Sequence, residues 1–255
     1  LHNYKNKTFM PALILNDNNE DENSHGGTGK GIIRQALNKF LKTVVEDGKK
    51  FDPSRVFSYQ NIDLDTQLFV IDDAKKNFNI EELFSFISEG VQIEKKGKQP
   101  IRIEFEDMPK NLITTNYALK GSGESHKRRK LDVVLDNHYN AKHTPQDEFG
   151  HLLFDDWDKE QWDLFDIFML RCISTYLEEG VQPIEHVNLL LKQFRLETHP
   201  DFEDFAERLA LNTEYDKTDL LIMWRKESGI ENFSKKVLSS WLNKFAKIKG
   251  YELKS

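Results

Sequence analysis

The feature that most constrains this chain is a glycine-rich run at residues 24–31, Ser-His-Gly-Gly-Thr-Gly-Lys-Gly. It follows an apolar segment at residues 12–16 that predicts a short buried strand, and it precedes a stretch from Ile32 to Val45 with helical spacing of apolar residues. This order places backbone N–H groups and the positive end of a helix dipole beside a lysine. The run therefore predicts a site for the phosphate groups of a nucleotide.

Six residues of the loop are candidates to bind the phosphates; they are Gly26, Gly27, Thr28, Gly29, Lys30 and Gly31, with Lys30 as the cation. The loop departs from the pattern G-x-x-x-x-G-K-[ST] at two positions. Ser24 stands where the first glycine is usual, and Gly31 stands where a hydroxyl would bind Mg²⁺. We expect water to replace that hydroxyl. A flexible loop without a ligand is the plain alternative, and the flanking strand and helix argue against it.

A second expected strand ends in two carboxylates. The apolar run at residues 67–71 is followed by Asp72 and Asp73, and Asp72 lies 42 residues after Lys30. Carboxylates at the end of a parallel strand lie at the edge of the sheet where ligands bind. Asp72 is the candidate to hold Mg²⁺ through water, and Asp73 is the candidate general base for an attacking water molecule. Without the glycine loop, such a run is often only a strand that leaves the core.

The rest of the first half predicts an α/β fold, with a P-loop type of parallel sheet flanked by helices. Further strands are expected at residues 56–59, 111–116 and 131–135, and a helix is expected at residues 80–89. Alternating apolar residues over 91–105, on either side of a lysine-rich turn, predict a β-hairpin.

After residue 145 the pattern becomes helical. Pro145 at a first turn and an aromatic-rich stretch at residues 158–178 predict two helices. Ser234 is a good N-cap for a helix that runs to about Lys247 and is followed by Gly250. The residues just beyond it resemble the first wing strand of a winged helix.

The expected domain organisation follows from this change of pattern. We expect a nucleotide-binding core at residues 1–145 and an α-helical region at residues 146–255, with a winged helix starting at about residue 205. No apolar stretch is long enough for a membrane-spanning helix.

Charge is distributed unevenly along the chain. The net charge of −7 argues against a protein that coats nucleic acid over its whole surface, but basic patches occur locally. Lys95, Lys96 and Lys98 lie on the turn of the expected hairpin, and Arg128 and Arg129 belong to a second patch. Lysines on a hairpin turn can contact successive phosphates of a nucleic acid strand. Without context, such residues are more often only solvated.

Four of these elements, taken in order, resemble a known family. The glycine loop, Asp72-Asp73, the lysine hairpin and a strand that ends in Asn116 resemble superfamily 3 helicases, a branch of the AAA+ ATPases. The resemblance covers roughly residues 10–145. The basic run with the segment Tyr139–Pro145 is similar to primase-helicase proteins of phages, plasmids and other mobile elements.

This resemblance implies an ATP-dependent DNA helicase or translocase that acts on single-stranded DNA during replication, in the cytoplasm of a bacterial host. ATP and Mg²⁺ would be its cofactors, and Asn116 would sense the γ-phosphate. The lysines of the hairpin would enter the channel of a ring, expected to be a hexamer. Arg128 or Arg129 would act as an arginine finger in the neighbouring subunit's site, with Arg129 slightly preferred. A primase domain or protein would be a partner.

Two other functions stay open from the sequence. Gly31 after the lysine also occurs in nucleoside monophosphate kinases, but no arginine-rich lid insertion is evident. A non-catalytic nucleotide- or DNA-binding module with a decayed ATPase site would explain both Ser24 and Gly31. The retained Asp72, Asp73 and Asn116 speak against a decayed site.

Three residue types have plainer interpretations. The single cysteine, Cys172, lies in an apolar run and is expected in the core, and it can form no disulfide within the chain. The histidines show no spacing typical of metal ligands, so no zinc site is expected; they include His25, His126, His138, His143 and His151. An aromatic series is expected to form helix core rather than to stack on bases; it consists of Phe154, Trp157, Trp162, Phe165 and Phe168.

Overall fold

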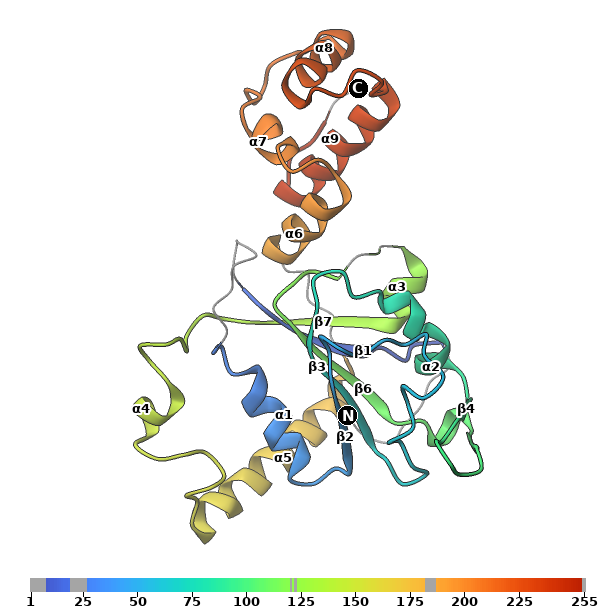
Figure 1. Cartoon of the computed structure of the whole chain (residues 1–255). Helices are drawn as coiled ribbons and strands as arrows, with labels where there is room; N and C mark the ends of the chain where they lie inside the picture. Colours follow the sequence, from blue (N-terminus) through green and yellow to red (C-terminus); the bar gives the residue numbers. More distant parts are fainter. Residues whose placement is uncertain (1–7, 19–26, 120, 122, 182–186, 254–255) are drawn as a thin grey trace. The chain divides into compact units, whose positions relative to one another are not determined.

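The structure, a computed structural model, describes residues 8–18, 27–119, 121, 123–181 and 187–253 (Figure 1). Ser24, His25 and Gly26 of the glycine-rich run lie outside the described residues. The chain divides into two compact units, residues 1–184 and residues 185–255, which are described separately. The boundary between the units therefore falls later than the expected change at residue 145.

The first unit is built on a five-stranded parallel sheet with the strand order β2-β3-β6-β1-β7. Its strands are β1 (Ala12–Asp17), β2 (Thr43–Asp47), β3 (Leu68–Ala74), β6 (Lys110–Thr115) and β7 (Lys130–Leu135). The strands expected at residues 12–16, 67–71, 111–116 and 131–135 are confirmed. The apolar runs of β1, β3 and β6 suit central strands, because both faces of a parallel sheet are covered by helices, whereas β7 lies at the edge.

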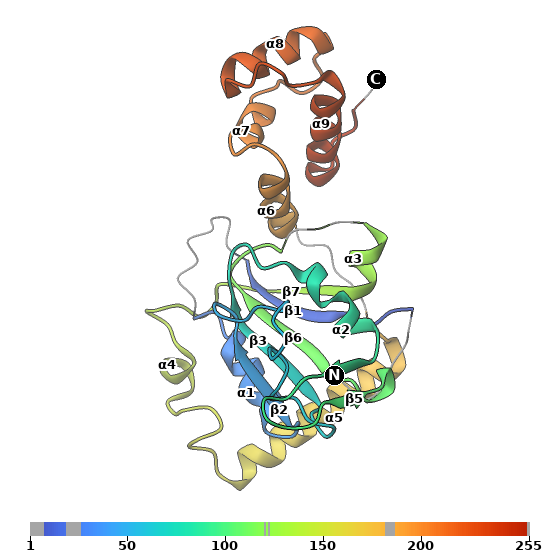
Figure 2. The same cartoon turned by 45° about the vertical axis from the view of Figure 1, so that its right-hand side comes forward.

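Helices cover both faces of this sheet. Alternate residues of the central strands form two clusters, one with Phe69, Ile71 and Ile113, and one with Leu68, Val70 and Leu112. The second cluster also contains Leu37 of α1 (Lys30–Asn38). The first contains residues of the short helices η1 (Ile80–Leu83) and α2 (Phe84–Ser88). Figure 2 shows α1 and α2 on opposite sides of the strands.

One helix and one strand were predicted wrongly. The helix expected to reach Val45 ends at Asn38, and β2 follows it. Three β-branched residues, Thr43, Val44 and Val45, pair in register with β3 and make the edge strand. The strand expected at residues 56–59 is instead a series of turns, with Val56 66% exposed. Periodicity alone could not separate a helix from an adjoining edge strand.

The expected hairpin is confirmed. It consists of β4 (Val91–Ile93) and β5 (Ile101–Ile103), which pair antiparallel, with the lysine-rich turn between them. Ile93 and Ile103 face the sheet cluster and are buried. A short turn of helix, η2 (Phe105–Asp107), connects the hairpin to β6. After β6 comes α3 (Glu124–Arg129), directly before β7.

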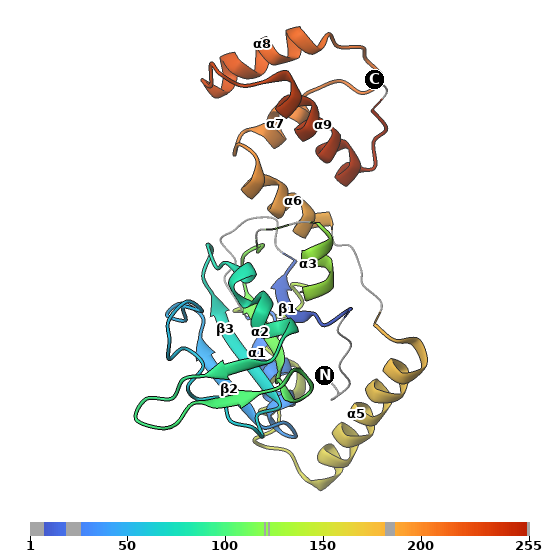
Figure 3. The same cartoon turned by 90° about the vertical axis from the view of Figure 1, so that its right-hand side faces the viewer.

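Two more helices complete the first unit, α4 (Pro145–Phe149) and α5 (Lys159–Glu179). Part of the aromatic series packs as expected: Phe154 is buried and its ring lies 4.7 Å from that of Trp157, between ring centres. Phe168 is 59% exposed and Cys172 is exposed, so the expectation of a core position was wrong for both. Figure 3 shows α5 as a long helix that stands apart from the strands, and none of its residues is buried.

In the second unit, the described residues 187–253 form helices joined by turns and loops. It contains α6 (Val187–Glu197), α7 (Phe202–Glu207), α8 (Lys217–Ser228) and α9 (Lys235–Lys249), packed around the fully buried Trp224. Ser234 caps α9 and Gly250 ends it, as expected. Residues 251–253 form no strand, so the expected wing is not observed in this part of the chain. Among the described helices none is long and apolar enough to cross a bilayer.

Candidate functional site

The carboxyl ends of β1, β6 and β3 lie side by side, so Asp72 and Asn116, which the sequence singled out, lie at the same edge of the sheet as Asp17. Asp17 ends β1, Asn116 directly follows β6, and Asp72 lies near the end of β3. Because β6 pairs with both β1 and β3, Asn116 lies between the other two positions. The helix α1 begins at the same edge with Lys30.

Lys30 joins two of these strand ends. Its ammonium group donates a hydrogen bond to Asn116 Oδ1 at 2.8 Å and forms a close ion pair with the Asp17 carboxylate. The Thr28 hydroxyl donates to the same carboxylate oxygen. The Asp17 side chain is completely buried, and that of Lys30 is 13% exposed. The lysine is therefore held in place by partners from β1 and β6.

Asp17 was missed by the sequence reading. It follows the apolar residues 12–16 as Asp72 follows residues 67–71, so the same pattern of a carboxylate at a strand end could have identified it. Its contacts with Lys30 and Thr28 belong to the phosphate loop and depend on how that loop folds back over the strand.

The backbone at the start of α1 is suited to an anion. Gly29, the N-cap, has a φ of 103°, in the left-handed region that favours glycine, and caps the helix with no side chain. The first N–H groups of a helix lack intrahelical partners, and the helix dipole adds positive potential there. Gly31 faces open space, so a side chain at that position would meet no neighbour.

Asp72 is held by partners from two other elements. The Thr114 hydroxyl of β6 donates to Asp72 Oδ1 at 2.7 Å. Arg34, one turn after Lys30 on α1, places its Nε 3.4 Å from Asp72 Oδ2, and this buried Nε makes no hydrogen bond. Asp72 was predicted as a ligand of Mg²⁺ through water. Its carboxylate is the oxygen donor that Mg²⁺ prefers, which fits such a role.

Asp73 adopts a strained backbone conformation. Its φ is 59°, unusual for a residue other than glycine, and its N–H donates to the Thr114 hydroxyl at 2.8 Å. Its carboxylate forms an ion pair with Lys49 at 2.6 Å, and this hydrogen bond raises the pKa of Lys49. Strain of this kind is common at functional sites, where surrounding contacts hold it.

Gly48 supports the chain at Asp72. Its N–H donates to the Asp72 carbonyl oxygen at 2.6 Å. A Cβ at Gly48 would lie 2.7 Å from Ala74 Cα and 2.8 Å from that carbonyl oxygen. The pairing of β3 with β6 also shifts register between Ile71 and Ala74. Close approach of the Gly48 backbone therefore accompanies the irregular end of β3.

A turn after β7 lies against the phosphate loop. A Cβ at Gly27 would lie 3.8 Å from Asn140 Cα, and one at Gly29 would lie 3.8 Å from the Tyr139 ring. Asn140 and His143 form a short antiparallel bridge that closes this turn. The sequence pattern of residues 139–145 supports a family resemblance but does not predict that this turn borders the phosphate loop.

The three lysines of the hairpin turn differ in their surroundings. The Lys95 ammonium group donates to the carbonyl oxygens of Gln60 and Ile62 at 3.0 and 2.8 Å and pairs with Asp63 at 2.7 Å. Its side chain is only 10% exposed, so Lys95 anchors the hairpin. Lys96 and Lys98 are exposed and are the lysines of this turn that a nucleic acid could reach.

The two candidate finger arginines also differ. Arg129 donates to the hydroxyl groups of Ser88 and Ser125 at 3.1 and 2.8 Å, and its guanidinium lies over the Phe84 ring. Arg128 is exposed. Their helix precedes β7, which begins beside Ala12, at the amino end of β1. From the rise of a strand, that edge is roughly 17 Å from the Asp17 end.

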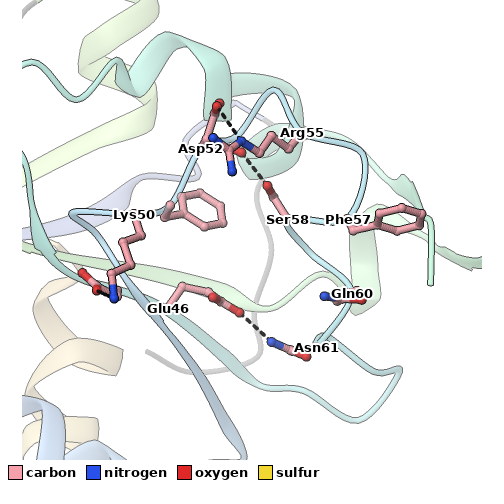
Figure 4. Close-up of a pocket in the computed structure, with 10 residues that line it drawn as sticks. Glu46, Lys50, Asp52, Arg55, Phe57, Ser58, Gln60 and Asn61 are labelled. Carbon is pink, nitrogen blue, oxygen red and sulfur yellow. Dashed lines mark hydrogen bonds and ion pairs between the residues drawn. The ribbon is translucent and has the colours of Figure 1, made fainter. Parts of the chain in front are cut away.

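A pocket of about 230 Å³ lies beside the carboxyl end of β2 (Figure 4). Several polar groups around it are paired with one another: Asn61 donates to Glu46 at 2.8 Å, and Arg55 and Ser54 both donate to Asp52. The pocket is therefore a less suitable phosphate site than the start of α1.

Comparison with known proteins gives one family match. Residues 23–129 match a family described as a family of unknown function, DUF5906. This span begins just before the glycine-rich run and ends at Arg129, so it contains nearly all of the candidate residues. No curated protein matches the chain.

Two solved structures are similar to the chain, both described as the A form apo structure of the NrS-1 C-terminal region. Each is 14% identical in sequence, and the TM-scores are 0.46 and 0.41. The matches cover 96% and 95% of this chain but only 59% and 58% of those chains. At this identity and TM-score, the similarity assigns no role to any residue.

Proposed function

We propose that this chain is an ATP-driven motor domain that moves on single-stranded DNA, of the superfamily 3 helicase type. The observation that best supports the proposal is the position of Lys30, which starts α1 and contacts both Asp17 and Asn116. Asp72 is tied to the same region by Thr114 and Arg34. A cation, a carboxylate and an amide from separate parts of the sequence thus converge where nucleotide phosphates would bind.

In this mechanism the chain's residues exchange partners when a nucleotide binds. Lys30 would turn from Asp17 to the phosphates, assisted by the backbone N–H groups of α1. The Nε of Arg34, which makes no hydrogen bond, would gain an acceptor. Asp72 would hold Mg²⁺ through water, and the ion would neutralise charge on the β- and γ-phosphates.

Asn116 and Asp73 would orient and deprotonate the attacking water. Asn116, already within hydrogen-bond distance of Lys30, would orient the water or contact the γ-phosphate. Asp73 would act as general base once its carboxylate leaves Lys49. Gly31 offers no hydroxyl, so water would complete the shell of Mg²⁺.

The basic side chains that are exposed are the ones we expect to contact DNA and a neighbouring subunit. Lys96 and Lys98 would contact DNA phosphates, whereas Lys95 would hold the hairpin in shape. Arg128 is the better candidate for an arginine finger, because Arg129 is engaged by Ser88, Ser125 and Phe84. Because Arg128 lies far from the chain's own phosphate loop, it would act in the phosphate site of a second copy of the chain. We therefore include a ring, expected to be a hexamer, in the proposal.

The test is Mg²⁺-dependent ATP hydrolysis with and without single-stranded DNA. We expect turnover that DNA stimulates, and a loss of about 10³-fold or more in Lys30→Ala. Lys42→Ala is the matched control, because Lys42 is an exposed lysine at the other end of the sheet. Asn116→Asp should keep nucleotide binding and lose hydrolysis. Equal loss in Lys42→Ala, or full activity in Lys30→Ala, would contradict the proposed site.

A nucleotide-binding module without turnover is the second candidate. The buried carboxylate of Asp17 already neutralises Lys30, and Gly31 provides no hydroxyl for the metal. Tight binding of ATP without hydrolysis, in preparations shown to form rings, would favour this candidate. Phosphate transfer to a nucleoside monophosphate would instead indicate a kinase.

A further inference from the structure

Three side chains beside the phosphate loop converge on one point. His138 Nε2 lies 2.9 Å from Glu148 Oε2, and His143 Nε2 lies 3.4 Å from the same oxygen. One ligand atom from each of the three residues lies within 4.8 Å of the other two. The spacing of these histidines in the sequence predicts no metal site, but the fold of this turn brings their ligand atoms close to the Glu148 carboxylate.

The backbone fixes these positions. Asn140 and His143 exchange two backbone hydrogen bonds at 2.9 and 3.2 Å, which closes the turn and brings His138 and His143 to the same side. Thr144 then starts α4 with a capping box that it shares with Asp147. Glu148 follows within the first turn of that helix. Local hydrogen bonds therefore hold all three side chains within reach of one another.

The distances suit a bound ion. A tetrahedral Zn²⁺ with bonds of about 2.0–2.1 Å to its ligands requires ligand atoms about 3.3 Å apart. The two distances to the Glu148 oxygen, 2.9 and 3.4 Å, lie on either side of that value. Two imidazoles and one carboxylate are ligands for zinc-like ions, whereas Mg²⁺ and Ca²⁺ prefer oxygen ligands throughout.

We propose that His138, His143 and Glu148 bind a divalent transition ion of the zinc type, with water in a fourth position. The side chains are 62%, 42% and 36% exposed, so an ion can enter from solution. Each histidine would bind the ion through an Nε2 that carries no proton, and the single proton of the neutral ring would then lie on Nδ1.

The location gives this ion a structural consequence. Tyr139 lies between His138 and Asn140 in this turn. Its ring is against Gly29 of the phosphate loop, and its hydroxyl is hydrogen-bonded to Glu148. Asn140 approaches Gly27. An ion bound by His138, His143 and Glu148 would make the turn that borders the phosphate loop more rigid. The metal site does not depend on the proposed motor function, since its ligands take no part in ATP hydrolysis.

The test uses the full chain without a histidine tag, stripped of metal by a chelator. Titration with Co²⁺ should give a visible absorption band that saturates at one ion per chain, and Zn²⁺ should displace it. His143→Ala and Glu148→Gln should each weaken binding by about 100-fold or more, because loss of a direct ligand exceeds the 10–100-fold effect of a supporting residue. His151→Ala is the matched control, since His151 contacts Gln161 instead.

A second measurement keeps the proposal testable if a variant folds poorly. Zn²⁺ should raise the midpoint of thermal unfolding of the unmodified chain and of His151→Ala, and leave that of Glu148→Gln unchanged. Absence of a cobalt band in the unmodified chain would overturn the proposal. So would binding that survives in His143→Ala and disappears in His151→Ala.

Discussion

The carboxyl edge of the sheet and the turn of the β4–β5 hairpin both gather charged residues, but they do so differently. At the carboxyl edge, Lys30 and Asp17 are buried and paired across elements far apart in sequence. At the hairpin turn, Lys96 and Lys98 are exposed, and only Lys95 is held by partners. Charges that are removed from water must be paired, so the ion pairs at the carboxyl edge form in the absence of a ligand. The second region presents charge to a partner.

The largest expected effect comes from unpairing the buried charge. Asp17→Ala leaves the Lys30 ammonium group with Asn116 but without its anion, and should lower the free energy of unfolding by about 3 kcal/mol. Asp17→Ala combined with Lys30→Ala should lose much less than the sum of the two single changes. Urea unfolding of the three variants measures this coupling. Strict additivity would mean that the pair is not formed in solution.

Backbone packing at the same edge should give the next largest effect. Gly48→Ala forces a Cβ against Ala74 and the Asp72 carbonyl, and should cost about 1–3 kcal/mol of unfolding free energy. Gly31→Ala meets open space within a helix and should cost nothing. Thermal unfolding of the two variants gives the comparison. A larger loss of stability in Gly31→Ala than in Gly48→Ala would contradict the close packing at Gly48.

The hairpin turn should affect DNA binding rather than stability. Replacing both Lys96 and Lys98 with alanine should weaken binding to single-stranded DNA and reduce the slope of log affinity against log salt by about 1.4, for two lost phosphate contacts. Lys42→Ala with Lys50→Ala makes the same change of charge at two lysines outside the turn. Fluorescence anisotropy at several salt concentrations measures both pairs. An equal reduction in the control pair would indicate a general charge effect.

The smallest expected effect is the pH dependence of the Lys95 anchor. The hydrogen bond and charge of Lys95 hold the pKa of Asp63 below its usual range. The stabilisation is therefore present above the pKa of an unfolded aspartate, about 3.9, and is lost as pH falls through the lower folded value. Asp63→Asn should flatten the pH dependence of unfolding in that acid range. An unchanged profile would show that the contact contributes nothing to stability.

Much of the fold was predictable because it follows from local pattern. The apolar runs of β1, β3 and β6 and the alternation in β4 and β5 each reflect burial of one or both faces of a strand. Ser234 and Gly250 likewise mark the ends of α9 through their own backbone preferences. These signals are contained in short segments, so sequence alone was sufficient to find them.

The sequence by itself determined which chemical groups lie at the ends of the central strands: Asp17 and Asp72, with Asn116 just beyond β6. Only the tertiary structure decided which groups are paired and which are exposed. Lys95 and Lys96 are neighbours in sequence, yet the carbonyl oxygens of Gln60 and Ile62 bind only Lys95. The same holds for β2, whose strand conformation comes from pairing with β3. Such contacts join distant segments, and no local pattern encodes them.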